Sequence, residues 1–319
     1  KSLRYQASFL CGNNVCTISE LLYGAISSTK MNSMKSACSI ITASIVLYKS
    51  KPDIIRDVIT SFFSDTVTKK KLILIDNSPT DSLRVLQEER PADIQYFFNN
   101  RNIGFGSAHN IGIREAARFN PSYHLILNPD VQFGPEVVPT LASYMDENPD
   151  IGLLMPQVYY PNGELQHLCK LFPRPWDVML RRFVPYRSYR ERNNERFELR
   201  NWSYDTIQDI PSLSGCFMFA RMDILRQVGG FDERFFMYAE DLDLCRRIGQ
   251  VSRTVFFPKV SIMHTYAKGS YHDAKLLRHH IVSLIRYFNK WGWLFDAERR
   301  RVNRACLAVL RNQTTVKKD

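Results

Sequence analysis

The chain has 319 residues, of which 45% are hydrophobic and 24% charged, so it can bury a full core and is not a disordered protein. Its formal net charge of +11 is compatible with nucleic acid, an anionic membrane face or a phosphorylated substrate, and does not choose among them. Seven cysteines without a CxxC pair argue against a zinc site and against a secreted disulfide framework. We therefore expect a cytoplasmic protein.

Residues 1–36 have neither the basic start and long apolar core of a signal peptide nor a clear periodicity. We interpret them as a dispensable leader, because Met31 and Met34 both precede the first convincing strand. No apolar run reaches the roughly 18 residues that a membrane-spanning helix requires, so any membrane contact is expected to be peripheral.

Short apolar runs alternate with helical patterns through the first half of the chain. The expected strands are 39–48, 70–76, 94–98 and 123–128, and the expected helices lie near 52–63, 81–90 and 106–118. This alternation predicts an α/β protein whose parallel sheet has helices on both faces. Functional groups in such sheets collect at the carboxyl ends of the strands, where Tyr48, Asp76 and Asp130 stand.

The second half is less regular. A polar segment runs from Pro161 to about residue 205, with its arginines over 173–205, and its length suggests a substrate-facing or partly mobile insertion. The elements expected after it are a strand at 212–221, a helix from 222, a break at Gly229–Gly230, a helix at 239–249, a strand at 253–258 and helices at 273–290 and 294–311. The last 45 residues, from Lys275, hold eleven basic and three acidic residues.

Asp130 is a candidate ligand for a hard divalent ion. It follows Asn128 and Pro129, and the proline steers the backbone out of the strand, so the carboxylate is presented beyond the sheet. Mg²⁺ is typically held by one or two protein carboxylates together with substrate phosphates. The alternative is a turn in which Asp130 only caps the strand.

Three acidic residues, Glu240, Asp241 and Asp243, open the helix expected at 239–249, where unpaired N–H groups and the helix dipole favour negative charge. Capping, together with pairing of Asp243 to Arg246 or Arg247, accounts for Asp243. Glu240 and Asp241 sit among the aromatics of FDERFFMYAED, a setting that raises a carboxyl pKa and suits a general base.

Two further features are open to more than one interpretation. His264 is either a structural histidine or a metal ligand, with Lys268 and Ser270 meeting phosphate oxygens. Gly104, Gly106 and Gly112 lead into a helix without completing a dinucleotide fingerprint, so we interpret them as a glycine turn that lets a nucleotide approach the backbone.

Six segments, in order along the chain, together resemble glycosyltransferase family 2 and, within it, the bacterial rhamnosyltransferase-like branch. They are SIVLYKS, LILIDNSPTDS, NNRNIGFGSAHNIGI, LILNPDV, SGCFMFARMDILRQVGGFDERFFMYAEDLDLCRRI and MHTYAKGS. The family implies a GT-A fold, a Rossmann-like, mostly parallel nucleotide-binding sheet. It places the catalytic domain at 37–270, with a donor half at 37–131 and an acceptor half at 132–270, followed by a basic helical region at 271–319.

The resemblance also implies roles for individual residues. Those expected to bind the donor nucleotide are Tyr48, Asp76, Asn102, Gly104, Gly106, Asn110 and Asp130. Asp130 and His264 would hold Mg²⁺ or Mn²⁺, although Asn128 replaces the first Asp of the family's DxD motif. Asp241 matches the general base, with Glu240 assisting, and Gly215 and Glu240 would meet the acceptor.

The implied reaction is an inverting transfer of rhamnose from dTDP-rhamnose to a lipid-linked saccharide, in the synthesis of a bacterial surface polysaccharide such as O-antigen or capsule. Alternative donors are UDP-galactofuranose and a UDP-hexose. A sugar nucleotidyltransferase would need a glycine-rich phosphate loop, which YKSKPD lacks. A nucleic-acid-binding protein is disfavoured, because the aromatics alternate with apolar rather than basic residues.

The C-terminal helices are expected to bind an anionic membrane at the inner face of the plasma membrane. Apolar residues such as Ile281, Leu284, Ile285 and Phe288 are interspersed there with basic ones, including Arg299 to Arg304. The alternative is that the apolar stripe packs on the catalytic domain.

Overall fold

The computed structural model describes residues 9–11, 14–16, 40–178, 195–265 and 274–316. The chain divides into two compact units, Lys1–Ser39 and Ile40–Asp319. In the first unit, the described residues form an antiparallel pair of short strands, β1 (Phe9–Cys11) and β2 (Asn14–Cys16). The second unit contains every candidate site residue.

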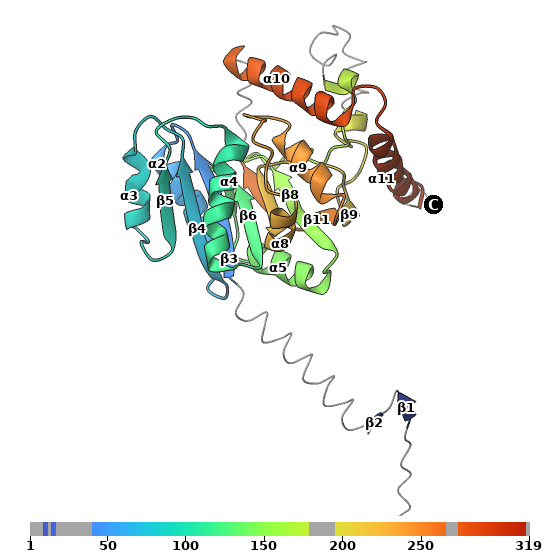
Figure 1. Ribbon diagram of the computed structural model, residues 1–319, viewed down its shortest axis with the longest axis horizontal. Coiled ribbons are helices and arrows are strands. Elements are labelled where there is room, and N and C mark those ends of the chain that lie inside the picture. The colour runs from blue at the N-terminus through green and yellow to red at the C-terminus, as the bar shows by residue number, and fades with distance from the viewer. Residues whose placement is uncertain (1–8, 12–13, 17–39, 179–194, 266–273, 317–319) are drawn as a thin grey trace, which may run out of the picture. The chain divides into compact units, whose positions relative to one another are not determined.

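One mixed sheet of nine strands, counted over the described residues, runs through the second unit (Figure 1). Its strands are β3 (Ile40–Leu47), β4 (Lys69–Asp76), β5 (Ile94–Phe98), β6 (Tyr123–Leu127), β7 (Val131–Phe133), β8 (Ile151–Tyr159), β9 (Gln208–Asp209), β10 (Phe217–Arg221) and β11 (Arg253–His264). They are arranged in the order β5-β4-β3-β6-β10-β8-β11-β7, with β9 paired to β11. The α/β fold class is therefore confirmed.

The four strands from the first half of the chain are parallel, as their alternation with helices predicted. β3 pairs with both β4 and β6. Leu47 and Asp76, the last residues of β3 and β4, are therefore paired with each other. β10 then inserts antiparallel between β6 and β8. The strand expected at 212–221 is shorter than predicted, because Ser212 forms an isolated bridge with Lys170 and β10 begins only at Phe217.

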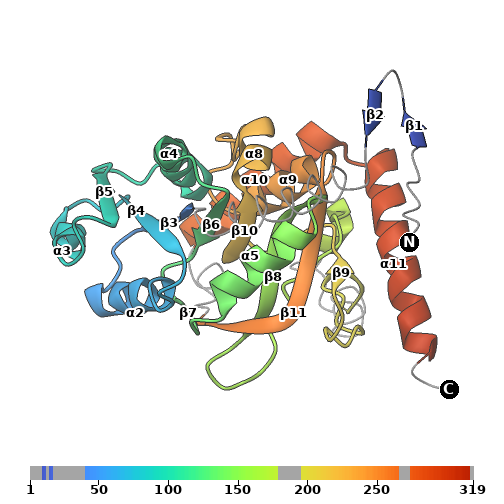
Figure 2. The same cartoon turned by 90° about the horizontal axis from the view of Figure 1, so that it is seen from below.

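Helices cover both faces of the sheet (Figure 2). They are α2 (Pro52–Phe62), η1 (Ser82–Arg84), α3 (Val85–Glu88), α4 (Phe105–Ala116), η2 (Ala117–Phe119), α5 (Val137–Glu147), α8 (Met222–Gln227), α9 (Glu240–Ile248), α10 (Ala274–Trp291) and α11 (Ala297–Val316). Side chains of α2, α3 and α5 enter one core cluster, and those of α4, α8, α9 and α11 enter another. The helix expected near 81–90 is present only as the short η1 and α3.

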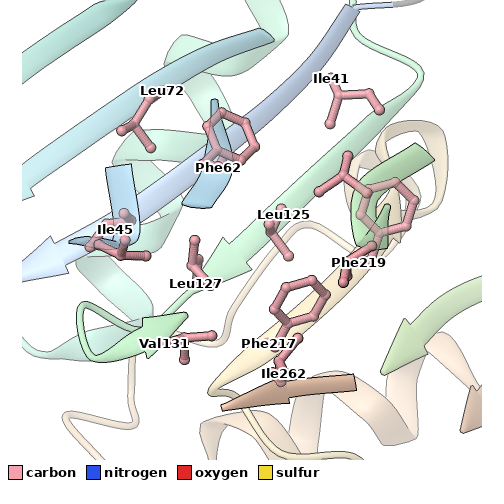
Figure 3. Close-up of a cluster of buried hydrophobic side chains, with 14 of the residues drawn as sticks. Ile41, Ile45, Phe62, Leu72, Leu125, Leu127, Val131, Phe217, Phe219 and Ile262 are labelled. Carbon is pink, nitrogen blue, oxygen red and sulfur yellow. The ribbon is translucent and has the colours of Figure 1, made fainter. Parts of the chain in front are cut away.

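The first core cluster shows how the sequence pattern becomes packing. In α2 a proline occupies the first turn, and Ile55, Val58, Ile59 and Phe62 recur at helical spacing and are all buried. Phe62 points toward Leu72 of β4 in the close-up of this cluster (Figure 3). Alternate residues of each central strand face the two clusters, which fixes their register.

A chain of buried hydrogen bonds ties α4 to the sheet. The Thr42 hydroxyl lies 2.8 Å from Nδ1 of His124, and the Ser44 hydroxyl lies 2.9 Å from Nε2 of His124 and 2.7 Å from Nδ1 of His109. Burial lowers the pKa of both imidazoles, that of His124 to about 3. The two rings therefore stay neutral, and α4 is held in a fixed place over β3 and β6.

The described part of the arginine-rich segment contributes hydrophobic side chains to the core, while Arg200, Asn201, Ser203 and Asp205 are exposed. Phe197, Leu199, Trp202 and Tyr204 are buried in the second core cluster, together with Cys306 and Leu310 of α11. Residues 179–194 lie outside the described part of the chain. Residues 195–205 are therefore anchored in the core by these side chains, and a substrate-facing role for the segment remains a prediction.

The two C-terminal helices are present, and their apolar side chains divide between core and solvent. Leu284, Tyr287 and Phe288 of α10 pack against Phe235, Ala239 and Leu242. Arg299, which was expected at a membrane surface, is only 3% exposed. The stripe around Leu284 and Phe288 thus packs on residues 235–242, in agreement with the alternative interpretation that it is buried against the rest of the chain.

No helix within the described residues is both long enough and apolar enough to span a bilayer.

Candidate active site

Asp130 and His264 meet at one corner of the sheet. Asp130 lies in the short connection between β6 and β7. His264 is the last residue of β11, which pairs with β7. The Asp130 Oδ1 atom is 3.4 Å from Nε2 of His264, and the Asn128 amide nitrogen is also 3.4 Å from that Nε2. His264 is 3% exposed, whereas the Asp130 side chain is 25% exposed, so this corner opens on the side of the carboxylate.

Gln166 fixes the orientation and the tautomer of His264. Its amide nitrogen donates to the backbone carbonyls of His264 (2.7 Å) and Tyr159 (3.3 Å), which leaves its carbonyl oxygen 3.0 Å from Nδ1 of His264. Because that oxygen only accepts, Nδ1 carries a proton and Nε2 is the ring nitrogen that faces Asp130. Nothing in the sequence around Gln166 indicated this contact.

The two residues fit a divalent ion. A carboxylate oxygen and an imidazole nitrogen 3.4 Å apart are close enough to bind one ion together. Within the described residues, no group of three or more His, Cys, Asp or Glu side chains could hold a metal. The donor set therefore suits an ion that takes its remaining ligands from substrate oxygens and water.

Glu240 and Asp241 begin α9, but the fold gives them different surroundings. Asp241 is half-buried, and its carboxylate accepts from the backbone N–H groups of Gly215 (3.3 Å) and Leu242 (2.8 Å). Glu240 is 6% exposed, and its Oε2 has no hydrogen-bond partner among the described residues. Burial raises the pKa of the Glu240 carboxyl well above its usual value, and the charge of Asp241 raises it further.

The start of β10 connects the Asp130 corner to the Asp241 corner. The Cys216 carbonyl accepts from the Asn128 N–H (2.9 Å), while the adjacent Gly215 N–H donates to Asp241. Burial raises the pKa of the Cys216 thiol to about 12, and the charges of Asp130 and Asp241 both raise it further. Adjacent backbone groups of Gly215 and Cys216 therefore bind Asp241 and Asn128, which are far apart in the sequence.

The loop before α4 closes against the segment that carries Glu240 and Asp241. Gly104 has φ +94°, and a Cβ there would lie 2.4 Å from the Phe236 carbonyl oxygen, so only glycine fits. The N–H of Phe105 donates to that same oxygen (2.9 Å). The Asn77 amide nitrogen holds the loop from the other side, at 3.2 Å from the Gly104 carbonyl and 3.4 Å from the Asn102 side-chain oxygen.

Two residues of this loop and helix have structural roles within the protein, while their expected contacts with the donor remain predictions. A Cβ on Gly106 would lie 2.9 Å from the Phe231 side chain, so the packing of that aromatic requires glycine at this position. Asn110 accepts from the Phe231 N–H and donates to the Phe231 carbonyl and to Glu233. Both polar ends of Asn110 thus link α4 to residues 231–233.

Tyr48 and Asp76 lie at the carboxyl ends of adjacent strands, as predicted. Tyr48 is 47% exposed, which leaves its ring available to a base. Asp76 is fully buried and accepts from the Tyr96 hydroxyl (2.5 Å) and the Ser78 N–H (2.8 Å). In this arrangement Tyr48 offers a surface to a ligand, whereas Asp76 is engaged within the protein.

Helix α10 holds the turn that leads into Glu240. Tyr238 and Ala239 are consecutive non-glycine residues with φ of 68° and 64°, a conformation that costs about 1–3 kcal/mol per residue. The Ser283 hydroxyl donates to the Met237 carbonyl (2.8 Å), and the ring of His280 lies 4.7 Å from that of Tyr238. These contacts hold a strained turn beside Asp241 (α9 and α10 in Figure 1).

Asp243 anchors α9 as the sequence predicted, with additional partners. It pairs with Arg247 (2.8 Å), while Lys290 (2.6 Å) and Trp291 (2.8 Å) of α10 bind its other oxygen. Arg246 pairs instead with Asp296 and Glu298. Lys268 and Ser270, proposed to meet phosphate oxygens, lie outside the described residues.

A surface hollow of about 680 Å³ lies along β7, beside the Asp130 corner. Asp57 and Ser61 of α2, Gln132 and Phe133 of β7, and Tyr159 of β8 are among the residues that line it. None of the candidate site residues is among those that line this hollow.

A family model described as glycosyl transferase family 2 matches residues 42–229, more than half of the chain. The N-acetylglucosaminyl-diphospho-decaprenol L-rhamnosyltransferase of Mycobacterium tuberculosis is 27% identical over 257 residues, which cover 75% of this chain and 81% of that protein. The rhamnosyltransferase WbbL of Escherichia coli K12 is 28% identical over 228 residues, which cover 68% of this chain and 81% of WbbL.

The fold is similar to that of a solved structure, GalNAc-T7 with UDP, GalNAc and Mn²⁺. The TM-score is 0.58 with 16% sequence identity, and the match covers 80% of this chain. This chain spans half the length of that protein. At such low identity the similarity shows a shared fold.

Proposed function

The chain belongs to glycosyltransferase family 2, and from that premise we propose that it moves a sugar from a nucleoside diphosphate donor to a hydroxyl of a saccharide acceptor. We propose inversion at the anomeric carbon. The observation that supports this proposal is a pair of hydrogen bonds at adjacent residues: the Gly215 N–H donates to Asp241, and the Cys216 carbonyl accepts from Asn128, two residues before Asp130.

Asp241 is the proposed general base. It is half-buried, so an acceptor hydroxyl can reach it, and two backbone N–H groups hold its carboxylate in place. As the hydroxyl oxygen bonds to the anomeric carbon, its proton passes to Asp241, and the bond from that carbon to the diphosphate oxygen breaks on the opposite face. Proton transfer to a positioned carboxylate contributes about 10²–10⁴-fold to such a step.

Glu240 is proposed to assist Asp241 from within the protein. Because burial raises the pKa of the Glu240 carboxyl well above its usual value, we propose Asp241 as the member of this pair that accepts the proton. Direct orientation of the acceptor, as first expected, would require an exposed group, and Glu240 is 6% exposed. We therefore propose Gly215 and Asp241 as the acceptor contacts.

Asp130 and His264 are the proposed holders of a divalent ion, Mg²⁺ or Mn²⁺, supported by their 3.4 Å approach and by the Mn²⁺ bound in the GalNAc-T7 structure of similar fold. When bound, such an ion offsets the negative charge that develops on the departing diphosphate. Gln166 keeps the His264 ring turned toward Asp130, and the half-exposed Tyr48 ring is the proposed stacking surface for the nucleotide base.

We propose dTDP-rhamnose as the donor, because the mycobacterial relative and WbbL are both rhamnosyltransferases. UDP-galactofuranose and a UDP-hexose are the alternatives. The name of the mycobacterial relative includes a diphospho-decaprenol, which supports a lipid-linked saccharide as the acceptor and a meeting with that acceptor at a membrane surface. A surface polysaccharide such as O-antigen or capsule is the proposed product class.

A donor panel tests the proposal. The purified chain is incubated with dTDP-rhamnose, UDP-galactofuranose or UDP-hexoses and a polyprenyl-diphosphate-linked saccharide, and both transfer and donor hydrolysis are measured. We expect turnover with dTDP-rhamnose and none with the Asp241→Asn variant. Turnover with only a UDP sugar would overturn the donor assignment, and nucleotidyl transfer from a nucleoside triphosphate would overturn the reaction class.

A further inference from the structure

The turn between α10 and α11 exposes two large apolar side chains. Leu294 is 58% exposed, and Phe295, at 89%, is more exposed than any other large hydrophobic side chain in the described part of the chain. Both follow Gly292, which has φ +98° and whose N–H donates to the Phe288 carbonyl (2.8 Å), ending α10. We call Leu294 and Phe295 the apolar tip.

The backbone of the apolar tip is held rigidly. The Arg299 guanidinium donates to the carbonyls of Trp293 (3.3 Å) and Leu294 (3.4 Å). Asp296, directly after Phe295, is 4% exposed and receives two 2.7 Å hydrogen bonds from Arg246 of α9. A turn fixed in this way presents its two apolar side chains in one place, and no described contact buries them.

Exposed basic side chains follow the apolar tip in the first turns of α11. Arg300 and Arg304 lie one turn apart on the same side of α11, and both are exposed, as is Arg301. Arg300 also donates to the Leu294 carbonyl (3.2 Å), which places its guanidinium beside the tip. The nearby acidic groups, Asp296 and Glu298, are already paired with Arg246. The surface around the tip is therefore positively charged.

We propose that the apolar tip inserts into the headgroup region of an anionic lipid membrane, with Arg300, Arg301 and Arg304 contacting the lipid phosphates. An exposed Leu–Phe pair followed by exposed arginines on α11 matches both the apolar and the anionic layer of such a surface. This differs from the sequence expectation, in which the stripe of α10 around Leu284 and Phe288 was the contact, because that stripe is buried.

The apolar tip is connected through Trp291 to α9, the helix that begins with the proposed catalytic residues. Trp291, which ends α10 just before the tip, donates to Asp243 of α9, and α9 begins with Glu240 and Asp241. A membrane seated on the tip would thus lie near the helix that carries the proposed base. The inference rests on the proposed function only in identifying the membrane as the place where a lipid-linked acceptor is met.

Vesicle binding tests the inference without any substrate. The full chain is sedimented at low salt with vesicles of phosphatidylcholine alone or mixed with phosphatidylglycerol. We expect binding to the mixed vesicles, about tenfold or more weaker binding by the double variant Leu294→Ser/Phe295→Ser, and unchanged binding by Val67→Ser. Val67 is 85% exposed on the loop before β4 and is the matched control.

The basic residues are tested separately. Arg300→Gln/Arg304→Gln should weaken binding to the mixed vesicles, and added salt should weaken binding by the wild type more than by this variant. The proposal is overturned if the wild type does not bind anionic vesicles or if the tip variant binds as well as the wild type. It is likewise overturned if the tip variant alters only the oligomeric state in solution.

The test is independent of catalysis. Transfer to a water-soluble acceptor should be the same for the wild type and the tip variant, because neither tip side chain belongs to the proposed site. Absence of that transfer in the wild type would count against the proposed function, whereas loss of vesicle binding alone would count against the membrane contact.

Discussion

Glu240 and Asp241 are adjacent in the chain, yet their carboxyl groups differ in exposure and in hydrogen bonding. Asp241 accepts from two backbone N–H groups at the edge of the site, whereas Glu240 is buried with one oxygen unpartnered among the described residues. Two neighbouring carboxyls with unlike surroundings can take different roles, one charged and one neutral.

The role of Asp241 leads to the first prediction. Asp241→Asn should reduce kcat by about 10²–10⁴-fold while leaving donor affinity nearly unchanged, because the amide keeps the shape but cannot accept a proton. Donor binding is measured by calorimetry beside the rate of transfer. If nucleotide affinity falls in step with the rate, Asp241 is a donor contact and the assignment as base is wrong.

The raised pKa of Glu240 predicts a pH-dependent cost to stability. In the unfolded chain this carboxyl ionises above pH about 4.3, but the folded protein keeps it protonated to higher pH, so folding loses stability as pH rises through that window. The loss is at most about 1.4 kcal/mol per pH unit. Glu240→Gln removes the ionisation, so the melting temperature of this variant relative to that of the wild type should rise as the pH increases above about 4.3.

Glu88→Gln, a change at an exposed position of α3, is the control for that measurement. The difference between its melting temperature and that of the wild type should not change with pH. A difference between Glu240→Gln and the wild type that stays constant with pH would show that Glu240 is not held protonated.

Asp130 is the proposed carboxylate ligand, and its removal should be costly. Asp130→Ala should lower transfer by about a hundredfold or more, because charge on the departing diphosphate would lose its counter-ion. The exposed Asp53→Ala is the matched control and should stay active. Full turnover by dialysed wild type in excess EDTA would contradict the metal dependence.

At the scale of elements, α10 contributes to the site although it lies at the opposite end of the chain from the donor residues. It touches the segment before Glu240 through Ser283 and His280, and it touches α9 itself through Lys290 and Trp291. The strained turn at Tyr238–Ala239 persists only if surrounding contacts hold it. We interpret α10 as the element that positions Asp241.

Ser283 provides a test of that interpretation. Ser283→Ala leaves the Met237 carbonyl without its partner and should lower stability by about 1 kcal/mol. A positioning role further predicts a severalfold lower kcat with little change in donor KM, at a temperature where the variant is fully folded. Arg278→Ala, an exposed change on the same helix, should alter neither. If Ser283→Ala lowers stability but leaves kcat unchanged, Ser283 has a structural role only and does not position Asp241.

At the scale of the whole molecule, the first 39 residues form a unit separate from the rest. A chain beginning at Met34 should therefore fold and keep its transfer activity, because every candidate site residue lies in the second unit. Circular dichroism and the donor assay check this against the full chain. An insoluble or inactive product would show that the N-terminal residues support the core.

The sequence by itself determined the parallel half of the sheet and the positions of the strand-end residues. Alternating β-branched runs and helical periodicity are local signals, so β3 to β6 and helices α2 and α4 were predictable, as was Asp130 just beyond a strand. The helix at Glu240 was also predictable, since acidic residues in a first turn are a local feature.

Only the tertiary structure decided how these parts meet. β10 pairs between β6 and β8, and the bond from Gln166 to His264 joins residues 98 positions apart. Such contacts leave no local periodicity, because hydrogen bonding between distant segments depends on the whole sheet order. The same reason explains why the sequence could not separate buried Glu240 from half-buried Asp241, or foresee that Leu284 would be buried while Phe295 stays in solvent.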